Sequence, residues 1–232
     1  MKEFDRYNDI YRDEIDKAVA FSGQSHDFYI KVKARFLLDL LGRMRAQSGA
    51  GRLRALDVGC GHGYIHPFLT AAGADLELTG IDVAGGVLDG ARKANPAVRY
   101  DVYDGRRLPY EAGSFDAAFT IAVMHHVPAA EWGGFLAEMR RVVKPGGLIA
   151  VIEHNPINPL TRWIVRTCPL DKNAVLLPSG QVARLLRDAG LVNIERRYIL
   201  FTPFEGRFFR KLDDWLGWLP LGAQYCMTAR VP

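Results

Sequence analysis

An acidic residue followed by three alternating glycines stands out in the stretch LDVGCGHGY, residues 56–64. The apolar residues before Asp57 predict a buried strand, and the glycines predict a loop that leaves its end. Glycine lets a backbone approach a ligand without a Cβ clash. Three kinds of ligand suit an acid and a glycine loop at this place: a dinucleotide, a nucleoside triphosphate or a sulfonium nucleoside.

The spacing of the glycines separates these ligands. A dinucleotide loop follows the pattern GxGxxG, and here Tyr64 stands where the third glycine would be. A phosphate loop ends in Gly-Lys followed by Ser or Thr, and no lysine follows these glycines. The pattern favours a sulfonium nucleoside, with a nicotinamide oxidoreductase kept as an alternative.

Two further acids end the next predicted strands. Asp82 comes 19 residues after Gly63, at the end of LELTGID, and its carboxylate can accept both hydroxyls of a ribose. Asp104 and Gly105 follow the third strand, within the stretch at 100–116, YDVYDGRRLPYEAGSFD. Ligands of open parallel sheets bind at this edge, so we expect these acids to face one site.

The stretch from Asp57 to Gly63 resembles motif I of the class I S-adenosylmethionine-dependent methyltransferases. Residues 100–116 are similar to the family's GDA…LPF…SFD pattern, and RRVVKPGGLIAVIE at 140–153 is similar to its fifth strand region. The resemblance runs from about Leu53 to Glu153, returns in LLRDAGLVNIE, and is greatest to the type 11 group of ubiquinone- and menaquinone-like methyltransferases. It implies that S-adenosylmethionine is the cofactor, that S-adenosylhomocysteine is the product, and that Asp104 accepts from the adenine amino group. The cofactor-binding residues implied are Asp57, Gly59, Cys60, Gly61, Gly63, Asp82, Val83, Asp104, Gly105 and Ile121.

Histidines follow the fourth and fifth predicted strands. His125 and His126 come after IAVM, and His154 follows Glu153 at the end of the fifth strand. Neighbouring strands lie about 4.8 Å apart, so these side chains can reach one reacting centre. We expect the three to be catalytic, with His154 the foremost candidate for a base. The alternative is that they pack against the cofactor or cap the next helix.

Polar residues and prolines are dense in the insertion at 154–178, which is expected to contact the acceptor. The candidate substrate-binding residues are Asn155, Arg162 and Arg166, joined by Tyr11 from the N-terminal helices. An arginine there would hold an acidic group on the acceptor. The alternative is that the polar groups cap turns of the insertion. The three cysteines form no CxxC pair, so we expect no metal site.

The predicted strands and helices that would position these residues alternate along the chain from Leu53 onwards. Two helices over 5–20 and 27–47 come first and are expected to form a helical cap, residues 1–50. Strands are expected over 53–58, 76–83, 98–104, 115–123 and 146–153, and near 193–201 and 223–231; helices over 64–73, 84–95, 131–143, 179–190 and 205–218. This order predicts one doubly wound Rossmann-like α/β domain over 51–232, with a seven-stranded, mostly parallel sheet and an antiparallel last strand.

Composition and motifs limit where the protein is expected to act and which macromolecules it is expected to bind. The charged N-terminus and the absence of a long apolar run or disulfide framework favour a cytoplasmic protein. Nucleic acid is disfavoured, because Met-His-His stands where many nucleic-acid amine methyltransferases carry Asn/Asp-Pro-Pro-Tyr. Peripheral membrane contact and the oligomeric state remain open.

The segment at 201–219 is the most aromatic part of the chain. At helical spacing, Phe208, Leu212, Trp215 and Leu219 form a stripe that is expected to be core, while Phe209 and Trp218 fall outside it. These surplus rings are expected either to line the pocket of an acceptor with a sizeable apolar part or to lie on a membrane or partner surface. The function expected is transfer of a methyl group to O, C or N of a small molecule. The alternatives are a catalytically silent S-adenosylmethionine-binding scaffold and another use of the same cofactor.

Overall fold

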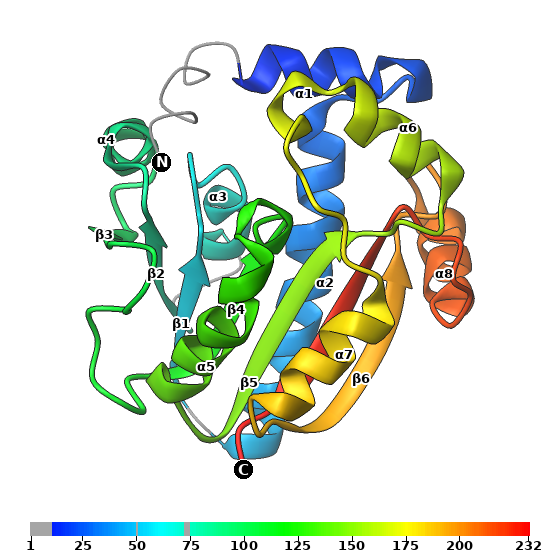
Figure 1. The fold of residues 1–232 in the computed structure, drawn as a ribbon. Coiled ribbons are helices and arrows are strands. Elements are labelled where there is room, and N and C mark those ends of the chain that lie inside the picture. The colour runs from blue at the N-terminus through cyan, green and yellow to red at the C-terminus, as the bar shows by residue number, and fades with distance from the viewer. Residues whose placement is uncertain (1–10, 50, 72–74) are drawn as a thin grey trace.

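The structure is a computed structural model that describes residues 11–49, 51–71 and 75–232 (Figure 1). A single sheet has the strand order β3-β2-β1-β4-β5-β7-β6. β1 to β5 run parallel, and β7 is antiparallel to both of its neighbours. The predicted doubly wound, seven-stranded fold is therefore confirmed. The strands are β1 (Leu53–Val58), β2 (Leu76–Asp82), β3 (Arg99–Val102), β4 (Phe115–Ile121), β5 (Val143–His154), β6 (Val192–Ile199) and β7 (Gln224–Arg230).

Helices cover both faces of the sheet and bury two separate sets of strand residues. On one face, α2 (His26–Ser48), α3 (His66–Thr70) and α4 (Gly85–Ala94) pack against the residues around Ala55 and Phe119. On the other, α5 (Trp132–Val142) and α7 (Ser179–Asp188) pack against those around Leu56 and Ala118. Successive strand residues point to opposite faces, so neighbours such as Ala55 and Leu56 belong to different cores.

α2 belongs to the main core. Its buried residues form the line Ile30, Ala34, Leu37, Leu41 and Met44, with Lys33 beside it. A second line, spaced by four residues, runs through Phe28, Val32, Phe36, Leu40 and Met44; its ends are buried and its three central residues are partly buried. Steps of four residues advance 400°, so a line of four such steps drifts around a helix of 3.6 residues per turn.

α1 (Tyr11–Val19) and the 3₁₀ helix η2 (Ala20–Ser22) precede α2. The expected helix start at residue 5 lies outside the described residues. Within the described part of the chain, no helix has the length and apolar character needed to cross a lipid bilayer.

The insertion after β5 contains a helix that the sequence analysis left as loop. α6 (Pro159–Thr167) begins after Asn158, whose side chain accepts a hydrogen bond from the Thr161 backbone nitrogen at 3.0 Å. Asparagine at the N-cap followed by proline is a helix start signal. A 3₁₀ helix, η5 (Pro169–Asp171), follows it and ends at Asp171. Ser179 is the first residue of α7, as the sequence predicts, and its hydroxyl lies 3.1 Å from the Tyr198 hydroxyl.

α8 (Arg207–Leu216) corrects the reading of the aromatic segment as core. None of its residues is buried, and Phe208 and Trp215 are 71% and 69% exposed. The strands on either side, β6 and β7, were expected where they occur. The aromatic stripe on α8 therefore lies on the surface, beside β6 at the edge of the sheet (Figure 1).

Candidate active site

The glycine loop leaves β1 with an unusual backbone. Gly59, Gly61 and Gly63 have φ values of 79°, 49° and 64°, which L side chains rarely adopt. A Cβ at Gly59 would come within 2.6 Å of Val123, and one at Gly63 within 2.5 Å of the Tyr100 hydroxyl. The loop is thus fixed by close packing on both sides. At Gly61 a Cβ would meet nothing within 4 Å, because this part of the loop faces a cavity.

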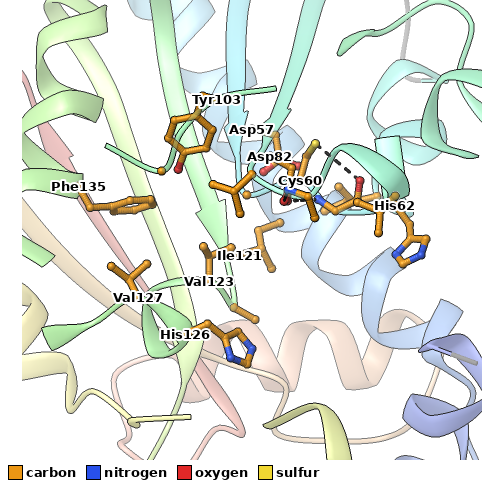
Figure 2. A pocket seen from close by; sticks show the side chains of 18 of the residues that line it. Asp57, Cys60, His62, Asp82, Tyr103, Ile121, Val123, His126, Val127 and Phe135 are labelled. Atoms are coloured by element: carbon orange, nitrogen blue, oxygen red, sulfur yellow. Dashed lines mark hydrogen bonds between the residues drawn. The ribbon is translucent and has the colours of Figure 1, made fainter. Parts of the chain in front are cut away.

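That cavity has a volume of about 550 Å³ and lies at the carboxyl ends of β1, β2 and β4 (Figure 2). Nine of the ten residues predicted to bind the cofactor line it; Gly63 does not. Figure 2 shows Asp57 and Asp82 near the glycine loop, with Phe135 and Val127 on the other side. Carboxylates at one end and apolar side chains at the other suit a nucleoside with polar substituents.

Asp82 joins the second strand to the glycine loop. Its Oδ2 accepts the Gly61 N–H at 2.8 Å, and its Oδ1 accepts the Ala84 N–H at 2.9 Å. Burial raises the pKa of Asp82, and these two backbone hydrogen bonds oppose the rise. Each carboxylate oxygen has a second lone pair, so the group can still accept the hydroxyls of a ribose.

Asp57 is held by a buried chain of hydrogen bonds that sequence analysis missed. Its Oδ2 lies 2.9 Å from His66 Nε2, and His66 Nδ1 lies 2.6 Å from the Tyr100 hydroxyl. His66 is completely buried and Asp57 is 3% exposed. The sequence places His66 in the first turn after the loop, but no local pattern links it to Asp57. The chain fixes Asp57 where it lines the cavity.

Asp104 lines the same cavity. Its Oδ1 accepts the backbone N–H groups of Arg106 and Arg107 at 2.8 and 2.9 Å. These hydrogen bonds lower the pKa of Asp104. The carboxylate is therefore ionised and oriented, as an acceptor for an adenine amino group must be. Together with Asp82 and the open backbone at Gly61, it makes a donor and acceptor set that fits S-adenosylmethionine.

A second cavity of about 230 Å³ adjoins the first. The two share four lining residues, His26, Lys33, Ala122 and His126. Apolar side chains dominate the rest of its wall and come from α1, η2, α6, η5 and the ends of β6 and β7, including Ile15, Val19, Phe21, Leu160, Ile164, Leu170 and Leu200. The second cavity is therefore placed to present an apolar molecule to whatever fills the first.

The three histidines predicted to be catalytic come together at the base of the second cavity. His125 is 1% exposed, with Nδ1 2.6 Å from Glu153 Oε2 and Nε2 3.5 Å from Asp171 Oδ1. Burial alone would lower the pKa of His125, but the carboxylates of Glu153 and Asp171 raise it to about 10. His125 is therefore an imidazolium at neutral pH and has no lone pair with which to accept a proton.

His126 and His154, unlike His125, are uncharged at neutral pH. Burial and the positive charge of His125 lower the pKa of each to about 4. The His126 Nε2 lies 3.5 Å from Asp171 Oδ1, and the His125 and His154 rings are 5.1 Å apart. Both are neutral at neutral pH, but a base with so low a pKa takes protons weakly.

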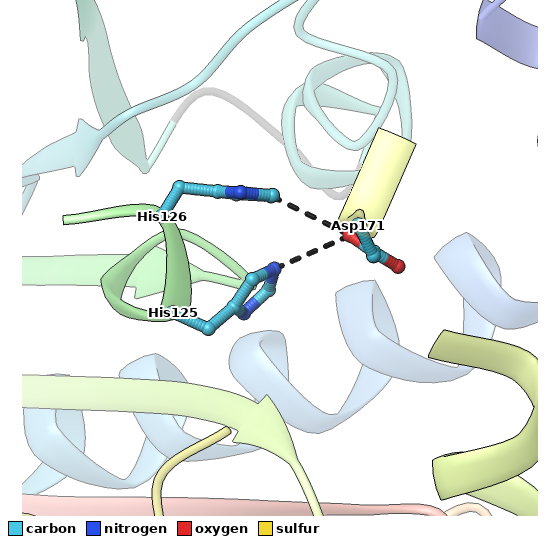
Figure 3. Close-up of side chains that lie close together, drawn as sticks. All are labelled: His125, His126 and Asp171. Carbon is cyan, nitrogen blue, oxygen red and sulfur yellow. Dashed lines mark ion pairs between the residues drawn. The ribbon is translucent and has the colours of Figure 1, made fainter. Parts of the chain in front are cut away.

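The same cluster presents atoms of the kind that bind metals. His125, His126 and Asp171 each offer one such atom, and these lie within 4.8 Å of one another (Figure 3). A metal ion would have to displace the proton that His125 holds between two carboxylates. The expectation of a metal-free site stays a prediction.

The candidate substrate-binding residues are placed differently from the histidines. Asn155 is buried and donates from Nδ2 to the carbonyl oxygens of Pro220 and Gly222, so it fixes the end of β5 and does not line either cavity. Arg162 and Arg166 lie on the exposed side of α6, and neither lines a cavity. The side chain of Tyr11 lies outside the described residues.

Lys33 and Gln224, which sequence analysis did not single out, do line the second cavity. The sequence does contain a signal for Lys33. It lies three residues after Ile30 and four before Leu37, so helical spacing places this lysine on the buried face of its helix.

Comparison with known proteins bears on this site. Residues 56–151 match the family described as "Methyltransferase domain". The chain is 34% identical over 130 residues to a phthiotriol/phenolphthiotriol dimycocerosates methyltransferase of Mycobacterium leprae, covering 55% of this chain and 47% of the relative. It is 31% identical over 183 residues to the protein of that name from Mycobacterium tuberculosis, covering 74% and 66%. The chain thus spans less than two thirds of the length of these curated relatives.

Solved structures share the fold. A SAM-dependent methyltransferase from Thermotoga maritima has a TM-score of 0.69 at 18% identity, with both chains fully covered. Another from Archaeoglobus fulgidus has a TM-score of 0.60 at 15% identity, covering 89% of this chain and all of the other. At these identities the likeness concerns the arrangement of the sheet and its helices.

Proposed function

Since this chain belongs to the class I S-adenosylmethionine-dependent methyltransferases, we propose that it transfers a methyl group to a small-molecule acceptor with a sizeable apolar part. The observation that supports this acceptor is the apolar second cavity, which shares His26, Lys33, Ala122 and His126 with the cofactor cavity. The named M. tuberculosis and M. leprae relatives, whose substrates are dimycocerosates, support a lipid-like acceptor as well.

The chemistry divides between cofactor and protein. S-adenosylmethionine, when bound, supplies an electrophilic methyl group on a positively charged sulfur. The protein holds the acceptor in the second cavity so that its nucleophile meets the shared wall, and most of the rate enhancement comes from this proximity and orientation. His126 lines both cavities and is neutral, so its ring can orient the nucleophile by a hydrogen bond.

The test is a panel of acceptors with contrasting polarity. The purified protein and S-adenosylmethionine are incubated with alkylphenols, isoprenoid quinols and hydroxylated acyl chains, and separately with small polar amines and acids. Formation of S-adenosylhomocysteine and of methylated product is measured by mass spectrometry. We expect turnover with apolar members only. Methylation of the polar set alone would contradict the proposal, and cofactor binding without any turnover would favour the silent scaffold.

A variant in the cavity wall links turnover to the structure. Ala18 lines the second cavity from α1, so Ala18→Phe should reduce its volume and raise KM for apolar acceptors about tenfold or more. Affinity for S-adenosylhomocysteine should stay unchanged. Ala137→Phe is the matched control, because Ala137 is exposed on α5 and lines neither cavity. Equal effects of the two substitutions would show that the second cavity does not receive the acceptor.

We also propose that the rim of the second cavity rests on an anionic lipid surface. Phe21 and Leu160 line the cavity and are 50% and 46% exposed, and Trp163, in edge contact with Phe21, is 52% exposed. Arg162 and Arg166 flank them on α6. Half-exposed aromatic rings beside arginines are typical of helices that lie at membrane interfaces. An apolar acceptor could then enter the cavity from the lipid without crossing water.

Vesicle binding tests this contact. The protein should sediment with vesicles that contain phosphatidylglycerol and much less with pure phosphatidylcholine. The double variant Phe21→Ser, Trp163→Ser should lose most of this binding. Val192→Ser is the control, because Val192 is 43% exposed at the start of β6, at the opposite end of the sheet (Figure 1). Binding that is equal in all three proteins would exclude the rim as the membrane surface.

A further inference from the structure

Lys33 is a buried lysine at the junction of the two cavities. It projects from the inner face of α2, is 8% exposed, and lines both cavities. Within the described residues it takes part in no hydrogen bond and no ion pair. Burial lowers the pKa of Lys33 to about 8, while the more distant charge of Glu153 favours its charged form. At neutral pH most molecules therefore hold an ammonium group here without a direct partner.

An unpaired buried ammonium destabilises a fold, because the charge has lost its hydration. The positive sulfur of the cofactor repels this ammonium, which leaves two negative partners: the cofactor carboxylate and an anionic acceptor, since Lys33 lines the second cavity as well as the first. The group that satisfies Lys33 must therefore be negative or strongly polarised toward oxygen, and it must lie in the space that the two cavities share.

Gln224 supplies a second polar atom in the same apolar cavity. It is 5% exposed at the start of β7, and its Nε2 lies 3.5 Å from His154 Nδ1. Its Oε1 has no hydrogen-bond partner among the described residues. The second cavity thus offers an ammonium donor and an amide acceptor, and its remaining wall is largely apolar.

The histidines do not supply a strong base for the acceptor. His125 already carries its proton between Glu153 and Asp171, and His126 and His154 accept protons only weakly. An acceptor with an ordinary alcohol would therefore remain protonated in this site. A hydroxyl that ionises easily needs no base, only a positive charge that stabilises its anion.

We propose that Lys33 binds the acceptor oxygen as an oxyanion, and that the acceptor class is an acidic hydroxyl, a phenol or an enol, carried on an apolar body. This inference rests on the proposed methyl transfer. The acceptor releases its proton to water on binding. An oxyanion lone pair forms the new O–C bond while the C–S bond of the cofactor breaks, and that electron pair stays on sulfur. Lys33 keeps its proton throughout, and the product ether leaves uncharged.

The experiment uses a chromogenic phenol, 2-hexyl-4-nitrophenol, whose visible absorbance reports its ionisation. Bound to the protein with S-adenosylhomocysteine present, the probe should show an apparent pKa lowered by about 1–3. Lys33→Met should abolish this decrease and weaken binding of the anion at least tenfold. Lys33→Arg should retain most of it, because the positive charge remains. Lys31→Met, an exposed lysine on the same helix, should behave as wild type.

Three outcomes overturn the proposal: no saturable binding of the probe, binding of the neutral phenol, or an equal pKa decrease in the Lys33→Met protein. Thermal melting shows that each variant is folded, and a methionine of similar length can fill the place of the lysine. The absorbance readout does not require turnover. Anion binding without methyl transfer would therefore count against the proposed function only, and turnover confined to non-acidic acceptors would count against Lys33 only.

Discussion

Three histidines of the same site differ in charge because their neighbours differ. His125 touches two carboxylates and is protonated, whereas His126 and His154 face His125 and are neutral. A sequence motif shows only that histidines are present. The hypothesis that His154 is a general base therefore meets a specific difficulty, since its low pKa leaves it neutral but weakly basic. Under the proposed function the histidines orient groups, and the positive charge of Lys33 stabilises the ionised acceptor.

Asp82 is the residue whose removal should affect the cofactor most. In Asp82→Asn, one oxygen still accepts a backbone N–H, but the charge is lost and the amide nitrogen faces a second donor, either Gly61 or Ala84. Affinity for S-adenosylhomocysteine should fall about 10- to 100-fold, as measured by calorimetry. Asp89→Asn, an exposed acid on α4, should leave the affinity unchanged. An unaltered affinity in folded Asp82→Asn would remove Asp82 from the ribose site.

Lys33 should also be visible in stability. Its folded pKa is about 8 against 10.5 in an unfolded chain, so the unfolded state binds the proton more tightly and the cost is fully present below pH 8. Lys33→Met should raise the free energy of unfolding at pH 7 by about 2–3 kcal/mol. That gain should shrink as pH rises from 8 toward 10.5. Denaturant melts across this range measure it, and a gain independent of pH would mean that the lysine is solvated.

At the scale of elements, Glu153 ties the end of β5 to the 3₁₀ helix η3 (Met124–His126). Its Oε1 accepts the backbone N–H groups of Val123 and Met124, and its Oε2 meets His125 Nδ1, with both side chains 1% exposed. Burial alone would raise the pKa of Glu153, but the charge and hydrogen bond of His125 lower it. The stability that this carboxylate contributes is therefore present above its unfolded pKa and is lost as pH falls through the folded value.

Glu153→Gln keeps the shape but turns a donor toward His125, which leaves buried groups unpaired. The free energy of unfolding should fall by about 2–4 kcal/mol. Urea melts at pH 7 measure the change, with exposed Glu195→Gln on β6 as the matched control. A loss of less than 0.5 kcal/mol, close to the usual effect of a surface substitution, would show that water reaches this pair.

How much the sequence predicts depends on how local each signal is. The strands, the glycine loop and the acids after β2 and β3 follow from short patterns and a known sheet rule, and they are placed as expected. Helical spacing places Lys33 on the inner face of its helix, but its meeting with Gln224 could not be found in this way, because the two meet only when α2 and β7 are packed on the sheet. The sequence analysis predicts no helix in the insertion, although Asn158-Pro159 marks the start of α6, because dense polar residues and prolines hide its periodicity.

At the scale of the whole molecule, α2 is part of the main core, and we expect that the domain cannot fold without it. Its residues Ile30, Ala34, Leu37, Leu41 and Met44 share one core with β1, α3 and α4. A chain that starts at residue 51 should therefore fail to fold, although it retains the complete sheet. We expect no cooperative thermal transition in calorimetry and strong binding of a hydrophobic dye. A cooperative transition near that of the full chain would instead make residues 1–50 a separable cap.

The two cavities are built by different parts of the chain, with only four residues in common. The wall of the first cavity comes mainly from the loops after β1 to β4, and that of the second from α1, α6, η5 and the ends of β6 and β7. Under the proposed function, substitutions in the second group alter which acceptor is methylated and leave the residues that line the first cavity unchanged. Such a protein can change its acceptor during evolution through substitutions in the second cavity alone. Only four positions, which line both cavities, constrain these substitutions: His26, Lys33, Ala122 and His126.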